Sequence, residues 1–231
     1  TRYWRDWSSD VCSSDLEYLR IDVNAEQLAG ALPLIKKGGF QGWNCTLPHK
    51  NSMFSLVDEA DASALEVKSV NTVKVENGRL LGFSTDAPGW RAAVEEHWGI
   101  RPEKNRIMIL GCGGVGQTLA WSLVKSGCRS LTLVNRDPTK AQKLFEQLGA
   151  TAAGRFPLRW VAWQSQDLDQ ALHETDLLIQ GTSLGLKSED PLPLDPATLS
   201  PNTKIYDTVY QKDLTPLVRA ARKLGYQAED G

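Results

Sequence analysis

The sequence contains no long apolar run: none approaches the ~20 consecutive apolar residues that a membrane-spanning helix needs. No secretory hydrophobic segment opens the chain. Its four cysteines, Cys12, Cys45, Cys112 and Cys128, stand at unrelated spacings without a C-x-x-C pair, which argues against a zinc site or a disulfide framework. A net charge of −2 with 41% hydrophobic residues gives no argument for nucleic-acid or membrane binding. These absences predict a soluble, cytoplasmic protein without a metal.

Residues 1–16 differ from the remainder of the chain. They repeat Ser-Ser-Asp around Val-Cys and show neither a helical nor an alternating apolar period. This stretch resembles translated sequencing-adapter strings more than a protein family, and the alternative is a native, poorly ordered tail. We therefore assign residues 1–16 to no domain and give them no chemical role.

The stretch 106–136 indicates a βαβ unit. An apolar run at 107–110 leads into a glycine-rich turn, a helical pattern extends to Gly127, and a second apolar run at 131–134 is followed by Asn135 and Arg136. In this context G-x-G-x-x-G is typical of a dinucleotide-binding turn, in which a helix N-terminus faces the pyrophosphate. The alternative is a glycine-rich turn in an α/β protein that binds no nucleotide.

Each glycine of this turn has a predicted role. Gly111 allows the sharp turn off the strand, Gly113 leaves room for the pyrophosphate, and Gly116 lets the helix lie close to the sheet. Gly114 and Val115 complete the predicted cofactor-binding turn.

The residues after the second apolar run indicate NADP. An acidic residue here usually binds the ribose 2′-hydroxyl of NAD, whereas an arginine suits a 2′-phosphate. The chain has Asn135 and Arg136, with Lys140 one helical turn later, and a guanidinium can hold a phosphate with two parallel bonds. Asp137 counts against this preference, and its alternative role is to cap the next helix, whose first turn contains Pro138.

The alternation of patterns predicts an α/β fold with two units. In the first, Asn24 and Gln27 resemble a capping box that starts a helix to about Lys37, and Asn77-Gly78 indicates a hairpin. The predicted strands of this unit are 18–23, 40–47, 70–75 and 79–83. In the second, the strands follow one another through helices and favour a doubly wound parallel sheet of Rossmann type. The predicted strands there are 107–110, 131–134, 158–163, 176–180 and 204–209.

The boundary between the units is predicted in the polar segment 99–105. We accordingly expect a substrate-binding and catalytic α/β domain at 17–104 and an NADP-binding Rossmann domain at 105–209. The segment 210–231 is predicted to be a C-terminal helix that packs back toward the first unit.

Polar residues cluster at the predicted strand ends of the first unit. Ligands of open α/β sheets bind beyond the carboxyl ends of strands, where these groups could converge. Lys50 and Asp86 suit carbonyl reduction, because an ammonium can give a proton to the oxygen while a carboxylate orients it. The alternatives are a solvated helix residue for Lys50, a helix N-cap for Asp86 and a strand-end turn former for Asn71.

Seven motifs, in order, resemble those of the shikimate dehydrogenase family over roughly residues 17–231. They are GWNCTLPHK, SVNTV, GFSTDAPGW, LGCGGVG, VNR, IQGTSLGL and YDTVYQKDLTPLVRAARKLG. The resemblance implies a two-domain α/β oxidoreductase that reduces 3-dehydroshikimate reversibly to shikimate with NADPH, in the shikimate pathway of aromatic amino acid biosynthesis. It implies a small-molecule substrate and a monomer or homodimer.

The resemblance also implies roles for individual residues. Lys50 and Asp86 match the catalytic pair of the family, and Thr46, Asn71 and Tyr210 match residues at the substrate. The implied cofactor-binding residues are Gly111, Gly113, Gly114, Val115, Gly116, Asn135, Arg136 and Lys140, with Thr182 and Leu186 on the nicotinamide side.

Four departures from the family pattern accompany these matches. The family begins with a strand and a Ser-x-Ser turn that residues 1–16 do not match, and it continues beyond the equivalent of Asp230-Gly231 into a helix that carries a glutamine. Ser84 stands where the family commonly has Asn, and Asp137 where NADP-type members often have Thr. The first two departures indicate a fragment of a longer enzyme. The alternatives are an NAD-dependent quinate/shikimate paralogue and a non-catalytic nucleotide-binding relic.

Overall fold

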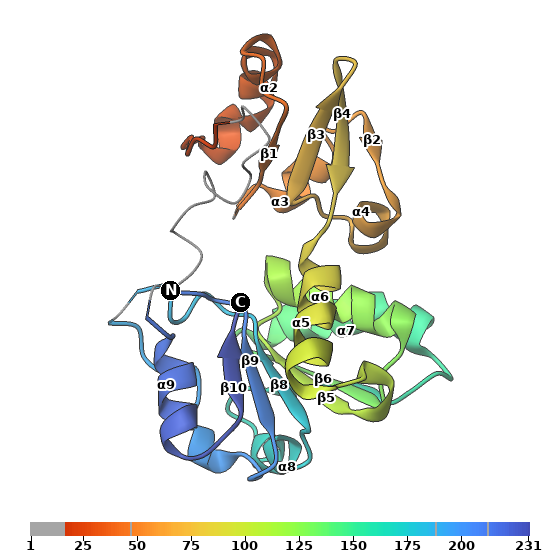
Figure 1. The fold of residues 1–231 in the computed structure, drawn as a ribbon. Helices are drawn as coiled ribbons and strands as arrows, with labels where there is room; N and C mark the ends of the chain where they lie inside the picture. Colours follow the sequence, from red (N-terminus) through yellow and green to blue (C-terminus); the bar gives the residue numbers. More distant parts are fainter. Residues whose placement is uncertain (1–16, 47, 188, 212) are drawn as a thin grey trace.

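The computed structural model of the chain describes residues 17–46, 48–187, 189–211 and 213–231. They form two α/β units, each built on its own sheet, and helix α5 (Asp86–Trp98) begins where the chain leaves the first sheet (Figure 1). The predicted α/β fold class is therefore confirmed. Within the described ranges, no helix is long and apolar enough to cross a membrane. The segment 1–16 and Leu47, the end of a predicted strand, lie outside the described residues.

The first sheet has four strands in the order β1-β3-β4-β2. Its strands are β1 (Gly42–Asn44), β2 (Glu59–Ala60), β3 (Thr72–Glu76) and β4 (Arg79–Phe83). Strands β3 and β4 are antiparallel, and Glu76 pairs with Arg79 across a turn in which Asn77 and Gly78 have φ angles of 50° and 75°. Two consecutive positive φ angles are what a two-residue hairpin turn requires, so the predicted hairpin is confirmed.

Three helices accompany this sheet: α2 (Leu28–Lys37), α3 (Lys50–Phe54) and α4 (Ala62–Val67). Leu28 and Leu32 of α2 pack with Met53, Val73 and Leu80 in one apolar cluster. This core fixes α3 against the sheet, and thereby places the N-terminus of α3 at the end of β3 that carries polar side chains.

Two predictions at the start of the chain are wrong. Residues 18–23 form no strand, because none of the described strands pairs with their backbone in a sheet ladder. The capping box is also absent: the side chain of Asn24 makes no cap hydrogen bond, and a 3₁₀ turn (Ala25–Gln27) precedes α2 instead. The predicted strand at 40–47 is shortened to β1.

The second sheet has six parallel strands in the order β10-β9-β8-β5-β6-β7. These are β5 (Arg106–Leu110), β6 (Ser130–Asn135), β7 (Leu158–Ala162), β8 (Leu177–Gln180), β9 (Lys204–Asp207) and β10 (Ala228–Asp230). All five pairings are parallel. In chain order this is the doubly wound Rossmann arrangement, whose direction of winding reverses between β5 and β8. The predicted doubly wound sheet is confirmed.

Helices cover both faces of this sheet, which is why its inner strands β5, β6, β8 and β9 are almost entirely buried, whereas the edge strands β7 and β10 are partly exposed. Helices α6 (Gly114–Ser126) and α7 (Pro138–Ala152) pack with α5 in one apolar cluster, and α8 (Asp167–His173) and α9 (Pro216–Lys223) contribute to a second. Helix α9 packs on β9 and β10 of its own sheet (Figure 1), so the prediction that it packs back toward the first unit is wrong. Its apolar residues Leu217, Val218 and Ala221 face Ile205 and Ala228, and strand β10 follows it.

Candidate active site

The side chains of Lys50 and Asp86 form an ion pair at the place where two helices begin. Lys50 is the first residue of α3 and Asp86 the first residue of α5. Lys50 Nζ donates to Asp86 Oδ2 at 2.6 Å, and their side chains are only 12% and 22% exposed. The alternative of a solvated Lys50 is therefore wrong. Asp86 is not a helix N-cap either, because that position belongs to Thr85.

Asn71 holds the other oxygen of this carboxylate. Its Nδ2 donates to Asp86 Oδ1 at 2.7 Å and to Thr85 Oγ1 at 3.0 Å, and its Oδ1 accepts from the backbone N–H of Thr85 at 2.9 Å. Asn71 is buried, directly before β3. Its amide thus fixes the carboxylate of Asp86 with one oxygen toward Lys50, and the structure gives it this positioning contact rather than the turn-forming alternative.

Hydrogen bonds extend from Asn71 toward the surface. Thr72 Oγ1 donates to Asn71 Oδ1 at 3.0 Å, Asn44 Nδ2 donates to Thr72 Oγ1 at 3.1 Å, and Tyr18 donates its hydroxyl to Asn44 Oδ1 at 3.1 Å. Asn44 ends β1 and Thr72 begins β3, and the two residues are paired in the sheet. The polar residues that the sequence places at strand ends are therefore brought together here.

His49, which the sequence analysis did not single out, connects α3 to the segment before α2. Its Nε2 lies 2.7 Å from the carbonyl oxygen of Val23. A carbonyl only accepts, so Nε2 carries the proton. His49 directly precedes Lys50, whose carbonyl accepts from the N–H of Val70 at 2.9 Å. The contacts of His49 with Val23 and of Lys50 with Val70 therefore hold the start of α3 in place. Its position next to a candidate catalytic residue was the one available signal.

The structure does not bring every predicted substrate residue into this group. Within the described part of the chain, the hydrogen-bonded group around Lys50 includes Asn71 but neither the side chain of Thr46 nor that of Tyr210. Thr46 is exposed in the loop before α3, and Tyr210 is 61% exposed in the loop after β9. Both side chains are accessible to a ligand.

The glycines of the turn between β5 and α6 are required by close packing. Gly111 has a φ of 97°, and a Cβ there would lie 2.7 Å from Thr182 Cγ2. A Cβ on Gly116 would lie 1.8 Å from the Gly111 carbonyl oxygen, far inside van der Waals contact. Helix α6 can therefore begin against the end of β5 only because both residues lack a side chain.

Gly113 differs, because a Cβ there would meet nothing within 4 Å. It occupies the N-cap position of α6, ahead of Gly114 and Val115, whose N–H groups belong to the first helical turn and have no partner within the helix. The Cys112 N–H is bonded to Asn135 Oδ1 at 3.0 Å, and Asn135 Nδ2 donates to the Asp137 carbonyl at 2.9 Å. Asn135 thus braces the turn, while the space above Gly113 is open to an anion.

Arg136 and Lys140 are exposed beside this turn. Asp137 is turned away into a helix cap: its Oδ1 accepts from the N–H of Thr139 at 3.0 Å and from the Thr139 hydroxyl at 2.6 Å. The Thr139 hydroxyl is the main reason why the pKa of Asp137 lies below its usual value. The alternative role of Asp137 as a helix cap is confirmed, and its carboxylate is engaged by α7.

The loop after β8 carries the two residues predicted on the nicotinamide side. Thr182 lies against Gly111, and its Oγ1 accepts from the N–H of Leu184 at 3.0 Å. Leu186 is 59% exposed. The loop therefore borders the nucleotide turn and presents an apolar side chain to solvent.

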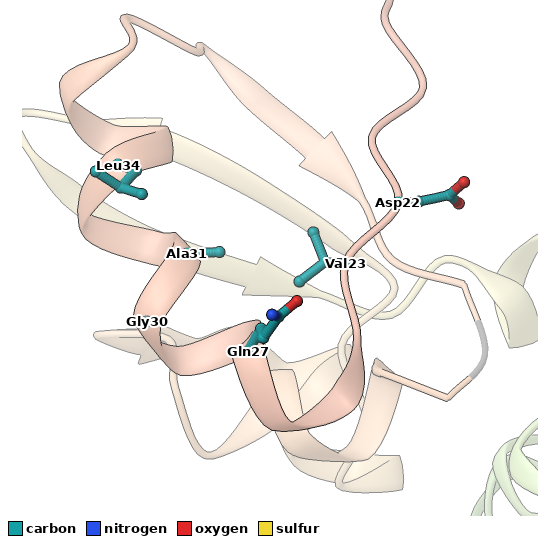
Figure 2. A pocket seen from close by; sticks show the side chains of 6 residues that line it. All are labelled: Asp22, Val23, Gln27, Gly30, Ala31 and Leu34. Carbon is teal, nitrogen blue, oxygen red and sulfur yellow. The ribbon is translucent and has the colours of Figure 1, made fainter.

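A cavity of about 400 Å³ lies elsewhere in the first unit, between the segment before α2 and one face of that helix (Figure 2). Side chains of Val23, Ala31 and Leu34 supply its apolar wall and Gln27 a polar one, whereas the carboxylate of Asp22 points away from them (Figure 2). Its lining includes no residue predicted for catalysis or for cofactor binding. The cavity is thus separate from the Lys50–Asp86 pair.

Comparisons with known proteins agree with this geometry. The family model described as the shikimate dehydrogenase substrate binding domain matches residues 8–73, and the model described as shikimate / quinate 5-dehydrogenase matches residues 94–187. A shikimate dehydrogenase (NADP(+)) of Rubrobacter xylanophilus is 37% identical over 219 residues, which are 93% of this chain and 74% of the relative. One from Desulfitobacterium hafniense is 34% identical over 217 residues, 93% of this chain and 76% of the relative.

Solved structures give the same result. Shikimate dehydrogenase from Aquifex aeolicus superposes with a TM-score of 0.79 at 30% identity, covering 93% of this chain and 74% of its own. Shikimate 5-dehydrogenase from Thermus thermophilus, in complex with NADP(H) and shikimate, gives a TM-score of 0.74 at 32% identity, covering 90% of this chain and 73% of its own.

Proposed function

The chain belongs to the shikimate dehydrogenase family, and we propose that it catalyses the NADP-dependent, reversible reduction of 3-dehydroshikimate to shikimate. The observation that carries this proposal is the Lys50–Asp86 ion pair of 2.6 Å, in which Asn71 holds the carboxylate of Asp86. This pair lies in a chain whose second unit contains a glycine-rich nucleotide turn. Relatives whose names state this activity are 34% and 37% identical to the chain.

The chemistry needs a hydride and a proton. NADPH, when bound, supplies the hydride to the carbonyl carbon. Lys50 Nζ supplies the proton to the carbonyl oxygen, and in the reverse direction it accepts the proton of the hydroxyl. Asp86 Oδ2 orients the ammonium, while Asn71 keeps Asp86 Oδ1 occupied, so that the carboxylate cannot rotate away from Lys50. This arrangement leaves the remaining N–H bonds of Lys50 for the substrate oxygen.

The residues around the nucleotide turn fit NADP. The open space over Gly113 and the unpaired N–H groups at the start of α6 suit a pyrophosphate. Arg136 and Lys140 are exposed and cationic where a 2′-phosphate would lie, and Asp137 is engaged by its helix. We propose Thr182 and Leu186 for the nicotinamide side.

We also propose that Thr46, Asn71 and Tyr210 contact the hydroxyl groups of the substrate. Support comes from the exposure of Thr46 and Tyr210 and from the place of Asn71 beside Asp86. Both N–H bonds of the Asn71 amide are used within the protein, so Asn71 would give up its contact with Thr85 to reach a substrate oxygen.

We further propose a cytoplasmic enzyme of aromatic amino acid biosynthesis that acts as a monomer or homodimer. The near-neutral charge of −2 supports a freely diffusing protein with small-molecule substrates. Sedimentation velocity over a range of concentrations measures the oligomeric state.

Steady-state kinetics test the activity. We expect the chain to reduce NADP⁺ in the presence of shikimate, with lower activity on quinate and with NAD⁺. Lys50→Met should lower kcat by about 10²-fold or more, whereas Lys37→Met, at an exposed position at the end of α2 in the same unit, should behave like wild type. Wild-type-like turnover of shikimate in Lys50→Met, or preferential oxidation of quinate with NAD⁺, would overturn the proposal.

A further inference from the structure

A second buried polar group lies at the carboxyl edge of the parallel sheet, apart from the Lys50–Asp86 pair. Gln180 ends β8, Asp207 ends β9, Asp230 ends β10, and Thr215 precedes α9. Gln180, Asp207 and Thr215 are at most 1% exposed. Burying a polar side chain costs free energy unless it is hydrogen-bonded. The hydrogen bonds of these three residues therefore show which parts of the chain they hold in place.

Asp207 ties down both ends of the loop 208–215. Its Oδ1 accepts from the N–H of Val209 at 3.0 Å, and its Oδ2 accepts from Thr215 Oγ1 at 2.7 Å. Thr215 Oγ1 itself accepts from the N–H of Val218 and so caps α9, while the Thr215 N–H donates to Asp230 at 3.2 Å. The loop that carries Tyr210 is thus anchored by a carboxylate that has no access to solvent.

Gln180 ties the loop 181–187 to the same carboxylate. Gln180 is the register partner of Asp207 on the neighbouring strand, where its amide lowers the pKa of Asp207, and its carbonyl accepts from the N–H of Thr208 at 2.9 Å. Its side-chain Oε1 accepts from the N–H of Thr182 at 2.6 Å, and its Nε2 donates to the Leu184 carbonyl at 2.8 Å. A second link joins the loops, because Gln211 donates to the Gly185 carbonyl. Thr182 in turn lies against Gly111 of the nucleotide turn.

We propose that Asp207 is a positioning residue, which through Gln180 and Thr215 holds the nicotinamide-side loop 181–187 and the described substrate-side residues 208–211 and 213–215 in one fixed relation. The roles of the two loops rest on the proposed function, whereas the link between them rests on the contacts alone. Loss of the negative charge of Asp207 should release both loops together, although Gln180 holds the first loop and Asp207 itself holds the second.

The protonation state of Asp207 provides a readout. Burial raises its pKa to about 6, and Asp230 on the neighbouring strand adds to this, while the hydrogen bonds from Thr215, Val209 and Gln180 oppose it. The pKa of Asp230 is likewise raised, first by burial, with Glu229 raising it further and Arg222 opposing. Protonation relieves the cost of burying the charge, which stabilises the fold as a whole, but it weakens the hydrogen bonds that hold the loops, because these favour the charged form. The loops should therefore loosen as the pH falls below about 6, even though global unfolding becomes no easier.

The experiment compares Asp207→Asn with Thr203→Val. Thr203 is a matched control, because it is buried at the opposite end of β9 and its hydroxyl donates to the Thr175 carbonyl at 2.8 Å. Amide hydrogen exchange and steady-state kinetics are measured on both variants and wild type. Should Asp207→Asn fail to fold, Thr215→Val is compared with Thr215→Ser, which retains the hydroxyl.

In Asp207→Asn we expect faster amide exchange at Thr182 and Leu184 as well as at Val209, and kcat/KM lower by about tenfold or more, as for a displaced site. The acidic fall of wild-type kcat/KM near pH 6 should disappear in the variant. Thr203→Val should show neither effect, and Thr215→Ser should retain most of the activity that Thr215→Val loses.

Faster exchange at Val209 alone, with kinetics like those of Thr203→Val, would overturn the proposal. The exchange measurement separates this outcome from a failure of the proposed function. If wild type oxidises no shikimate, coupled exchange at Thr182 and Val209 still supports the link, and uncoupled exchange still refutes it.

Discussion

Gly113→Ala separates the requirements of the fold from those of the cofactor. Gly113 has φ −86° and ψ −166°, an extended conformation that any residue adopts, and a Cβ there would meet nothing within 4 Å. The substitution at this N-cap position should therefore lower the free energy of unfolding by no more than about 1 kcal/mol. The fold would tolerate a side chain at this position, so the fold does not explain why the residue is glycine. The need to leave room for a ligand does.

The expected loss of NADP affinity follows from the same geometry. A methyl group over Gly113 would occupy the space through which a phosphate oxygen reaches the N–H groups of the first helical turn. Losing one such charge-assisted hydrogen bond costs about 1.5 to 3 kcal/mol, which corresponds to roughly tenfold to more than a hundredfold weaker binding. Shikimate binding by the first unit should change little.

Two further glycines calibrate the measurement. Gly116→Ala places a Cβ 1.8 Å from the Gly111 carbonyl oxygen, so it should destabilise the fold itself. Gly149→Ala, inside α7 with nothing within 4 Å of the added Cβ, should instead raise the free energy of unfolding by about 0.5 to 1 kcal/mol. Denaturant titration gives the stabilities, and calorimetric titration gives the NADP affinities. If Gly113→Ala binds NADP as tightly as wild type, the pyrophosphate does not lie on this turn and the reasoning is refuted.

Three other outcomes are expected. Lys50→Met and Asp86→Asn should each lower kcat by about 10²-fold or more, and the double variant should lose little beyond the worse single one, since both residues serve one proton transfer. A double variant whose loss in stopped-flow kinetics equals the product of the two single losses would contradict this. Arg136→Ala should weaken NADP binding by about tenfold to a hundredfold while leaving NAD unchanged in calorimetric titrations, and equal losses for both cofactors would place Arg136 away from the 2′-phosphate. Because burial raises the pKa of Asp207 to about 6, the folded chain binds more protons than the unfolded chain between about pH 4 and pH 6, and stability falls as the pH rises through that window. The Asp207→Asn variant lacks this fall, because its side chain does not titrate. The difference in the free energy of unfolding, variant minus wild type, should therefore increase by up to about 3 kcal/mol between about pH 4 and pH 7. If urea titrations give a difference that does not change with pH, the pKa of Asp207 is not raised.

The nucleotide-binding unit was predictable because its signals are local. The glycine at 111 is needed for a positive φ, and the glycine at 116 for contact within the same turn, so their spacing in sequence is also their spacing in space. The Asn77-Gly78 hairpin is predictable for the same reason. Short continuous apolar runs between such turns belong to strands that helices cover on both faces, and β5 and β6 lie where the runs predicted them.

Elements that depend on distant neighbours were missed. Strand β2 has two residues and exists only through its pairing with β4, and β10 only through its pairing with β9. Residues 18–23 alternate like a strand, yet alternation alone supplies no partner for their backbone. The role of Asp207 was hidden likewise: the sequence motif shows an acidic residue, but its burial and its contact with Gln180 arise from packing of β8 against β9.

Helix α5 explains how the two units share one active site. Its first residue, Asp86, bonds Lys50 and Asn71 of the first unit, while Trp90 and Val94 on the same helix are buried in the core of the second, against α6. Figure 1 shows α5 lying beside α6, directly below the first sheet. The carboxylate therefore lies on a helix whose later turns pack in the nucleotide-binding unit, and the ammonium lies on a helix of the first unit. Because α6 begins at the nucleotide turn, the packing of α5 and α4 against α6 fixes where the 2.6 Å Lys50–Asp86 pair lies relative to the cofactor site.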